Sequence, residues 1–341
     1  MNLFTKLQNK ISEFKLQINY MKKFPRIVFI GSNNFSLFSL KKLHNKYNII
    51  GIITIPDNYF FKGENAFSPL KKYAINYHIP FMQPKNLLDF YFLKNLKRWN
   101  ADIQVVVSFR ILPQSVWNLP KFGTINFHAS LLPQYKGPAP IHWAIINGEK
   151  KTGATIFFIE KKIDSGKIIL QKEVTIEKEE TAGDLEQKIG KISGPMLITS
   201  IEKIITKNIT KLHPIQSNKN ITFKYAPKIF SQDCRIQWEQ GSITSICNKI
   251  RGLSPYPTAW TLLCLNNTKY YRFKIFLAKK IQKKHNLSIG IILFSRDNMM
   301  ISVKNGFISV IIGQIEGRKK MNVKNLINGI NINARKNSFV E

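Results

Sequence analysis

Hydrophobic residues in the first part of the chain fall into short continuous runs, separated by stretches with helical spacing. RIVFI at 26–30 and NIIGIIT at 48–54 are continuous apolar runs, and residues 35–46 between them have apolar positions at helical intervals. A strand, a helix and a second strand in this order form a βαβ unit, and continuous apolar strands are typical of a parallel sheet covered on both faces. Further strands are expected at 79–82, 104–109 and 123–130, and a helix at 86–98. The pattern therefore predicts an α/β fold with a Rossmann-like, mostly parallel sheet and flanking helices.

The first strand-to-helix turn reads GSNNFS, from Gly31 to Ser36. A dinucleotide-binding turn has the form G-x-G-x-x-G, because glycines let the backbone approach the pyrophosphate. Asn33 and Phe35 would crowd that approach. The Rossmann-like architecture therefore does not indicate a nicotinamide cofactor here.

The pattern changes in the second half of the chain. ATIFFIE at 154–160 and IILQKEVTI at 168–176 look like an antiparallel pair, joined by a turn that contains Asp164, Ser165 and Gly166. A long helical pattern follows, and then a polar, basic segment without periodicity. Beyond it, short strands separated by Asn, Gly and Asp are typical of a small, OB-like β-barrel. We therefore divide the chain into an N-terminal extension at 1–20, an α/β catalytic domain at 21–206, a linker at 207–224 and a C-terminal barrel at 225–341.

The charge of the chain narrows the choice of partners only in part. The 341 residues include 52 Lys and Arg against 20 Asp and Glu, a formal net charge of +32. A charge of this size favours a polyanionic partner such as nucleic acid. An abundance of Lys, Asn and Ile is also what an AT-rich genome would give, so both explanations stay open.

The cellular compartment is indicated by three features of the sequence: its apolar runs, its N-terminal segment and its cysteines. No apolar run reaches the roughly 18–20 residues that a membrane span needs, and residues 1–20 lack the features of a secretory signal. The three cysteines, Cys234, Cys247 and Cys264, have no zinc-binding spacing. We expect buried or free thiols in a reducing cytoplasm.

Two polar residues interrupt the strand expected at 123–130. Asn126 and His128 are two positions apart, so their side chains share one face about 7 Å apart, and Phe127 points to the other face. An amide and an imidazole in this arrangement suit a carbonyl that becomes an oxyanion while an attacking amine loses a proton. Each polar residue also has an ordinary structural explanation, and Asp164 alone would be a turn-forming residue. None of the three indicates an enzyme by itself.

Four segments together resemble the 10-formyltetrahydrofolate-dependent formyltransferases. They are FRILP at 109–113, INFHASLLPQYKGPAPIHWAIINGE at 125–149, TGATIFF at 152–158 and IDSGKII at 163–169. The resemblance implies catalytic roles for Asn126, His128 and Asp164, with 10-formyltetrahydrofolate as co-substrate and no metal. It also implies folate contacts from two segments, which comprise Arg110, Ile111, Leu112, Ser130, Leu131, Leu132 and Pro133.

Sequence outside this shared core indicates the acceptor of the formyl group. GSNNFS, PDN, SPLKKYA and MQP occur in the order found in members that act on methionyl-tRNA, and GPAPIHWAIINGE is similar to the same members. A complete C-terminal domain fits a tRNA substrate, whose phosphates extend well beyond the reacting amine. The resemblance therefore implies initiator methionyl-tRNA as partner and a tRNA-binding barrel. We also expect a monomer that works in translation initiation without a membrane.

Two other functions stay open. A sugar-nucleotide N-formyltransferase would share the catalytic core but would need no basic C-terminal domain. A degenerate RNA-binding protein would not need to keep all three catalytic positions. An assay with labelled formyl donor and either charged tRNA or amino-sugar nucleotides separates these possibilities.

Some positions depart from the family pattern or are assigned less directly. The loop at 56–68 has Lys62 as its only cation, and its aromatic residues Tyr59, Phe60 and Phe61 could stack on exposed bases. His142 stands where Asn or Gln is more usual, and we interpret it as structural. Candidates for phosphate contacts in the C-terminal domain are Arg251, Lys269, Arg272, Lys274 and Lys279.

Overall fold

A computed structural model describes residues 24–57, 67–161, 164, 166–208, 213–214, 222–266, 268–331, 333–335 and 337–341. The expected extension at 1–20, the middle of the 56–68 loop with Lys62, and most of the expected linker lie outside the described residues. The chain forms two compact units. One contains the chain up to Pro133 with Gly153–Glu173 and Gln187–Thr222, and the other contains Gln134–Thr152, Val174–Glu186 and Phe223–Glu341.

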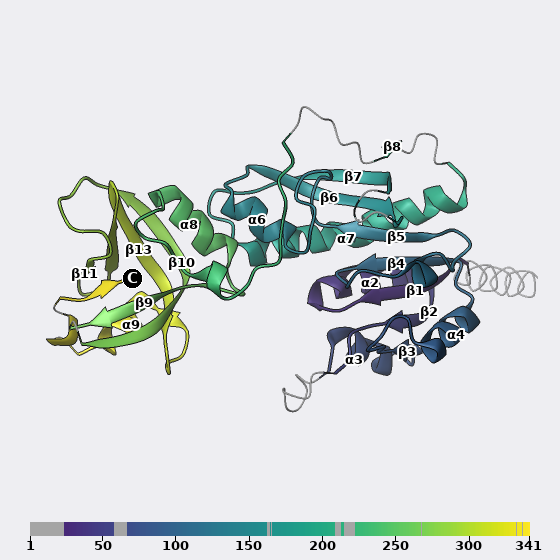
Figure 1. Cartoon of the computed structure of the whole chain (residues 1–341), viewed down its shortest axis with the longest axis horizontal. Coiled ribbons are helices and arrows are strands. Elements are labelled where there is room, and N and C mark those ends of the chain that lie inside the picture. Colours follow the sequence, from purple (N-terminus) through teal and green to yellow (C-terminus); the bar gives the residue numbers. More distant parts are fainter. Residues whose placement is uncertain are drawn as a thin grey trace, which may run out of the picture. The chain divides into compact units, whose positions relative to one another are not determined.

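The first unit is built on a mostly parallel sheet, as the hydrophobic runs predict (Figure 1). Its strand order is β3-β2-β1-β4-β5-β6-β7-β8. The strands are β1 (Arg26–Gly31), β2 (Asn48–Ile53), β3 (Phe81–Met82), β4 (Ile103–Val107), β5 (Thr124–His128), β6 (Lys151–Phe158), β7 (Lys167–Thr175) and β8 (His213–Pro214). Strands β3, β2, β1, β4 and β5 pair in parallel, whereas β6 runs antiparallel to β5. The α/β class with a Rossmann-like sheet is therefore confirmed.

Helices connect the parallel strands, and those after β1 and β3 lie where the periodicity predicts them. They are α2 (Asn34–Lys46), α3 (Pro69–Asn76), α4 (Phe90–Trp99) and the short α5 (Gln114–Trp117), and the long α7 (Ala182–Ile205) follows the strand pair β6 and β7. Asn33, in the first strand-to-helix turn, caps α2, because its side chain accepts a hydrogen bond from the Ser36 amide. The GSNNFS turn therefore starts a helix with a polar cap.

The second unit contains an antiparallel β-barrel, which confirms the expected architecture of the C-terminal region. The strand order is β11-β12-β13-β10-β9-β15, with β14 beside β13. The bounds are β9 (Ala259–Leu265), β10 (Lys269–Gln282), β11 (Ile292–Phe294), β12 (Met299–Val303), β13 (Gly306–Ile315), β14 (Met321–Asn322) and β15 (Phe339–Val340). A bridge between Ile291 and Phe339 joins the two ends of this order, so the barrel is nearly closed.

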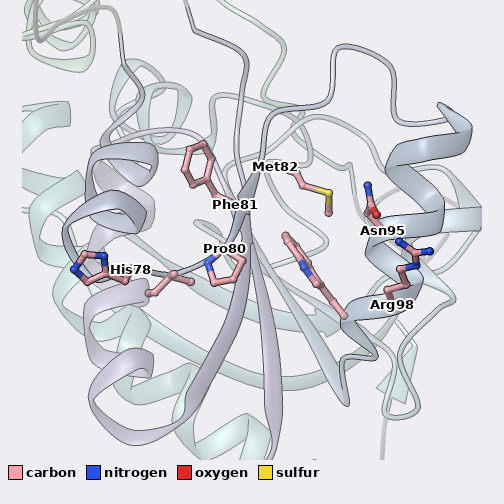
Figure 2. Close-up of a pocket in the computed structure, with 8 residues that line it drawn as sticks. His78, Pro80, Phe81, Met82, Asn95 and Arg98 are labelled. Atoms are coloured by element: carbon pink, nitrogen blue, oxygen red, sulfur yellow. The ribbon is translucent and has the colours of Figure 1, made fainter.

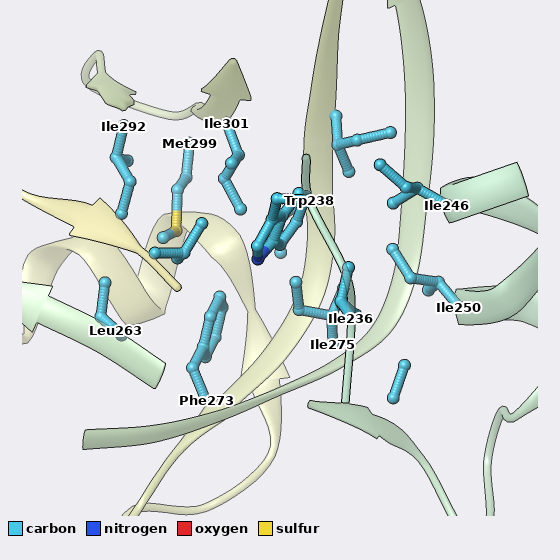
Figure 3. Packing of buried hydrophobic residues seen from close by; sticks show 14 of the residues in the cluster. Ile236, Trp238, Ile246, Ile250, Leu263, Phe273, Ile275, Ile292, Met299 and Ile301 are labelled. Atoms are coloured by element: carbon cyan, nitrogen blue, oxygen red, sulfur yellow. The ribbon is translucent and has the colours of Figure 1, made fainter. Parts of the chain in front are cut away.

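Helices α6 (Pro140–Ile146), α8 (Ile243–Gly252) and α9 (Val323–Asn328) belong to the same unit. Ile243, Ile246 and Ile250 lie on one face of α8 and are buried in the barrel core. Figure 3 shows this core, where Phe273 and Ile275 of β10 face Ile292, Met299 and Ile301 from the β11–β12 hairpin. Apolar side chains from strands far apart in the sequence therefore fill the barrel.

All three cysteines are free thiols, as expected. Cys234 and Cys264 are buried, and burial raises the pKa of the Cys247 thiol to about 11. Within the part of the chain that the structure describes, no helix combines the length and apolar character that crossing a membrane requires.

Candidate active site

Asn126 and His128 lie where the sequence analysis expects them, on β5 and on one face of the sheet. Because register partners in a sheet share a face, Val106 of β4 and Phe157 of β6 flank Asn126, and Thr155 of β6 flanks His128. Phe127 points to the opposite face, where its ring lies 5.9 Å from that of Phe35. His128 is the last residue of β5 and is only 8 % exposed. The amide and the imidazole are therefore held on a rigid strand.

The segment after His128 is fixed by hydrogen bonds from two neighbouring strands. The Thr155 hydroxyl donates to the Ser130 carbonyl at 2.7 Å and accepts from the Leu132 amide at 3.0 Å. The Gln171 side-chain amide, on β7, donates to the Leu132 carbonyl at 2.9 Å and to the Thr155 hydroxyl at 3.0 Å. These contacts pin the backbone of residues 130–132.

The four residues expected to contact folate after β5 differ in exposure. Ser130 is fully buried, and Leu132 is buried against Phe157 and Ile168. Leu131 and Pro133 keep part of their surface exposed. The folate contacts of this segment stay a prediction, and the exposure favours Leu131 and Pro133 as the side chains that could make them.

The residues of the second expected folate segment, Arg110–Leu112, also differ in exposure. The Arg110 guanidinium donates to the backbone carbonyls of Lys85, at 2.8 Å, and Pro84. Leu112 is only 7 % exposed and packs in the core cluster that contains Val106. Ile111 is 70 % exposed. Ile111 is therefore the apolar side chain of this segment that stands free to meet a ligand.

Asp164 lies in the turn between β6 and β7, as the sequence predicts. It has a left-handed φ of 47° and is half-buried; its neighbours Ile163 and Ser165 lie outside the described residues. The Ile159 amide donates to the Thr124 carbonyl at 2.8 Å, so the turn leaves the sheet at the amino end of β5. Ile159 packs on the cluster that contains Val106, which brings the start of the turn onto the face of Asn126. A contact between Asp164 and His128 requires the turn to continue along that face, and it stays a prediction.

The glycine of the IDSG motif has a clear steric reason. A Cβ atom at Gly166 would lie 1.7 Å from the carbonyl oxygen of Phe158. No side chain fits in that distance. Gly166 therefore allows β7 to start close against the end of β6, which sets the shape of the turn that carries Asp164.

Sequence reasoning missed the polar residues that support the site. These are Thr155 and Gln171. Elsewhere in the sheet, an ion pair between Lys71 and Asp57 joins the start of α3 to the loop after β2, and Gln83 donates to Asp57 at 2.7 Å. Burial alone would raise the pKa of Asp57, but its hydrogen bonds to Gln83 and Lys71 lower it overall. The only sequence signal was the turn-forming PDN at 56–58, which gives no indication of its partners.

The pocket in Figure 2 lies away from these residues. It has a volume of about 670 Å³ and is lined by His78, Ile79, Pro80, Phe81, Met82, Asn95, Arg98 and Trp99. Strand β3 is the edge of the sheet, four strands from β5 in the strand order. This pocket is therefore separate from Asn126 and His128.

Two of the cations expected to bind phosphates are engaged within the fold. Arg251 donates to the Asn248 side chain and to the Glu180 carbonyl, both at 3.0 Å. Arg272 lies 4.1 Å from the centre of the Trp260 ring and donates to the Ser231 hydroxyl at 2.9 Å. Lys269, Lys274 and Lys279 are the better candidates for a phosphate contact.

His142 has the structural environment that the sequence analysis assigns to it. Its Nδ1 atom is 2.8 Å from the Gly252 carbonyl oxygen, which places the imidazole between α6 and α8. Burial lowers the pKa of His142, although the hydrogen bond to Gly252 opposes this. The neutral imidazole therefore helps join the two helices.

Comparison with known proteins places this geometry in a family. The formyl transferase family matches residues 25–201, and the formyl transferase C-terminal domain matches residues 228–331. A methionyl-tRNA formyltransferase from Azobacteroides pseudotrichonymphae is 43 % identical over 310 residues, which cover 89 % of this chain and 95 % of that protein. The enzyme of the same name from Flavobacterium johnsoniae is 41 % identical over 307 residues, covering 89 % and 96 %.

A solved structure shares the fold at lower identity. The N-formyltransferase from Helicobacter canadensis, in complex with folinic acid and dTDP-3-aminofucose, has a TM-score of 0.60 and 22 % identity, covering 87 % of this chain and 99 % of that one. Both halves of the chain and nearly the full length of the two relatives are matched. The chain therefore belongs to the formyl transferase family and, within it, to the methionyl-tRNA formyltransferases.

Proposed function

We propose that this protein transfers the formyl group of 10-formyltetrahydrofolate to the α-amine of initiator methionyl-tRNA, giving N-formylmethionyl-tRNA for translation initiation. The observation that carries the proposal is the identity of 43 % and 41 % to two methionyl-tRNA formyltransferases, each over 89 % of the chain. The Helicobacter canadensis N-formyltransferase is only 22 % identical in sequence, so its similarity shows the fold alone. Because charged tRNA is a substrate of translation, we infer that the protein works in the cytoplasm. A monomer stays an expectation.

In the proposed reaction the α-amine nitrogen attacks the formyl carbon, and the bond between that carbon and N10 of the folate then breaks. The amine loses one proton and N10 gains one. Negative charge develops on the formyl oxygen in between, and donors already held in place stabilise it most effectively. The Asn126 amide and an N–H of the His128 imidazole would supply these donors, since the two side chains share one sheet face.

Asp164 would orient the imidazole and help carry the amine proton away. Its place in the turn after Ile159, which starts on the face of Asn126, supports this role. The scheme requires no metal, because an amine and an activated formyl amide react once they are held in register.

The folate substrate would lie against the two segments that adjoin the site. Arg110 is tied to the backbone at 84–85, which leaves Ile111 exposed. Leu131 and Pro133 keep exposed surface beside the pinned backbone of Ser130 and Leu132. A preformed apolar rim of this kind suits the flat pterin ring.

The barrel would hold the acceptor arm of the tRNA through phosphate contacts. Lys269 is exposed, Lys274 is half-buried opposite Trp260, and Lys279 has one long and exposed ion pair, to Glu179 at 4.0 Å. Such side chains can exchange a weak partner for a phosphate at small cost.

The test is a choice of acceptor. The protein is incubated with 10-formyltetrahydrofolate labelled in the formyl group and with either methionyl initiator tRNA or a set of amino-sugar nucleotides. We expect label on the methionyl-tRNA only, with uncharged tRNA as the control that lacks the α-amine. Label on the amino-sugar nucleotides instead, or on neither acceptor, would overturn the proposal.

A further inference from the structure

We infer that Thr155 is a positioning residue for formyl transfer, which fixes the backbone after His128 and thereby the folate-facing segment. This inference rests on the proposed function. Thr155 lies on β6 directly opposite His128, and its side chain is fully buried on the same face of the sheet. Figure 1 shows β5, β6 and β7 side by side, which is the arrangement that lets a β6 side chain reach both neighbours.

The hydroxyl of Thr155 uses its full hydrogen-bonding capacity on this one segment. A hydroxyl has one hydrogen to donate and two lone pairs that accept. The donated bond goes to the Ser130 carbonyl, and the two accepted bonds come from the Leu132 amide and the Gln171 amide. A different rotamer of the side chain would break these bonds, so the hydroxyl favours the observed backbone conformation at residues 130–132.

Packing around the segment makes the hydrogen-bonded arrangement specific. A Cβ atom at Gly153 would lie 2.6 Å from the Leu131 side chain, so Leu131 packs closely over the β6 backbone. Leu132 fills a small cluster with Phe157 and Ile168. The side chains after His128 are therefore seated on β6 and β7, and Thr155 determines where the backbone between them lies.

The role of Thr155 follows from the consequence of losing these bonds. A valine at position 155 keeps the shape of the side chain but leaves the Ser130 carbonyl and the Leu132 amide without their partner in a buried place. The segment would shift to find other partners, which would move Leu131, Pro133 and the imidazole of His128. A shift of about 1 Å near reacting groups can cost on the order of 100-fold in rate.

The test compares Thr155→Val with two matched variants. Thr155→Ser restores the hydroxyl. Thr152→Val makes the same change on the same strand, at a buried threonine whose hydroxyl has no hydrogen-bond partner among the described residues. We expect T155V to lower kcat/KM for the folate on the order of 100-fold, through a higher KM for the folate together with a lower kcat, with the KM for methionyl-tRNA unchanged. T155S and T152V should stay within about threefold of the original protein.

The split between the two KM values distinguishes positioning from damage to the fold. Partial unfolding reduces the amount of active enzyme and leaves both KM values unchanged.

If T155V folds poorly, Gln171→Met provides a second variant. Gln171 is exposed, so its replacement removes the two donated bonds without leaving a buried cavity. We expect Q171M to raise the KM for folate in the same direction, by about five- to tenfold. Unchanged KM for folate in both T155V and Q171M would overturn the inference, as would a T155S variant as impaired as T155V.

A measurement without turnover separates this inference from the proposed function. Hydrogen exchange at the Leu132 amide should become faster in T155V and stay slow in T155S and T152V. If the original protein transfers no formyl group, the proposed function fails, whereas the exchange result still reports on the Thr155 bonds. If transfer is normal in T155V, the positioning role fails and the proposed function stands.

Discussion

The end of β5 and the core of the barrel are both buried, but they differ in the polarity of their buried side chains. Around His128, polar groups are buried among the apolar ones: Thr155 and Ser130 are fully buried, and Thr155 uses every hydrogen-bonding position that it has. In the barrel core, Phe273 and Ile275 are apolar, and the Trp238 indole N–H donates to the Thr261 hydroxyl. Removing a group near β5 should therefore disturb orientation and chemistry. Removing one from the barrel should reduce stability.

The largest effect is expected from His128→Ala. Loss of the imidazole removes a donor to the oxyanion and a route for the proton, so formyl transfer should fall roughly 10³- to 10⁴-fold. The melting temperature should change little, because His128 is the last residue of its strand. The measurement is single-turnover transfer of labelled formyl to methionyl-tRNA.

His78→Asn is the matched control, since His78 lies four strands away with a left-handed φ of 52° that Asn tolerates. The assignment of His128 would be wrong if H128A turned over at a near-normal rate while remaining folded.

Phe273→Ala tests the other side of the comparison. Its ring is fully buried at the centre of the barrel, so truncation should lower the free energy of unfolding by about 3–5 kcal/mol. Urea denaturation of the barrel, followed by hydrogen exchange in β10, measures the loss. A shift as small as that of the exposed control Lys283→Ala would mean that the core does not depend on this ring.

A smaller effect is expected from Lys269→Ala and Lys274→Ala, which concern the surface of the barrel. If each lysine contacts a phosphate, each variant should bind methionyl-tRNA a few-fold more weakly, and the slope of log affinity against log salt should fall by about 0.7–0.9 per residue. Fluorescence anisotropy over a range of salt concentrations measures this slope. Lys97→Ala, on α4 of the other unit, is the control, and an unchanged slope in both barrel variants would exclude these contacts.

The smallest effect concerns pH and His142. The folded protein lowers the pKa of this histidine, so the unfolded chain binds a proton more readily as the pH falls. The stability that depends on a neutral His142 is therefore complete above its ordinary pKa of about 6.5 and decreases as the pH falls below it. His142→Gln keeps a donor for the Gly252 carbonyl and cannot titrate. Its unfolding free energy should depend less on pH between about 5 and 7, and an identical pH dependence in both proteins would contradict this.

Local patterns were sufficient for most of the fold. The strands around Val28, Ile52 and Val106 were predicted from continuous apolar runs, and the barrel from short strands between turns. The division of the chain was harder to predict. Residues 134–152 and 174–186 belong to the same compact unit as the barrel. Helix α6 packs on α8, and the half-buried His142 bonds Gly252, 110 residues away. The expected domain boundaries stay a prediction.

The site also has features that the local sequence predicts and features that it does not. Asn126 and His128 share a face because side chains alternate along a strand, which is a local rule that the sequence reveals directly. Leu112 and Arg110 were expected to contact folate, but one is in the core and the other is tied to the backbone at 84–85. Ile111 carries the exposed apolar surface, and no local pattern separates these three neighbours.

The sequence by itself determined the class of the fold, the shared face of Asn126 and His128, and the family to which the chain belongs. Only the tertiary structure decided what holds the end of that strand in place: the bonds of Thr155 and Gln171 to residues 130–132. The reason is physical. Side-chain direction follows from the repeat of the strand itself, whereas a hydrogen bond between residues many positions apart depends on which strands and helices become neighbours when the chain folds.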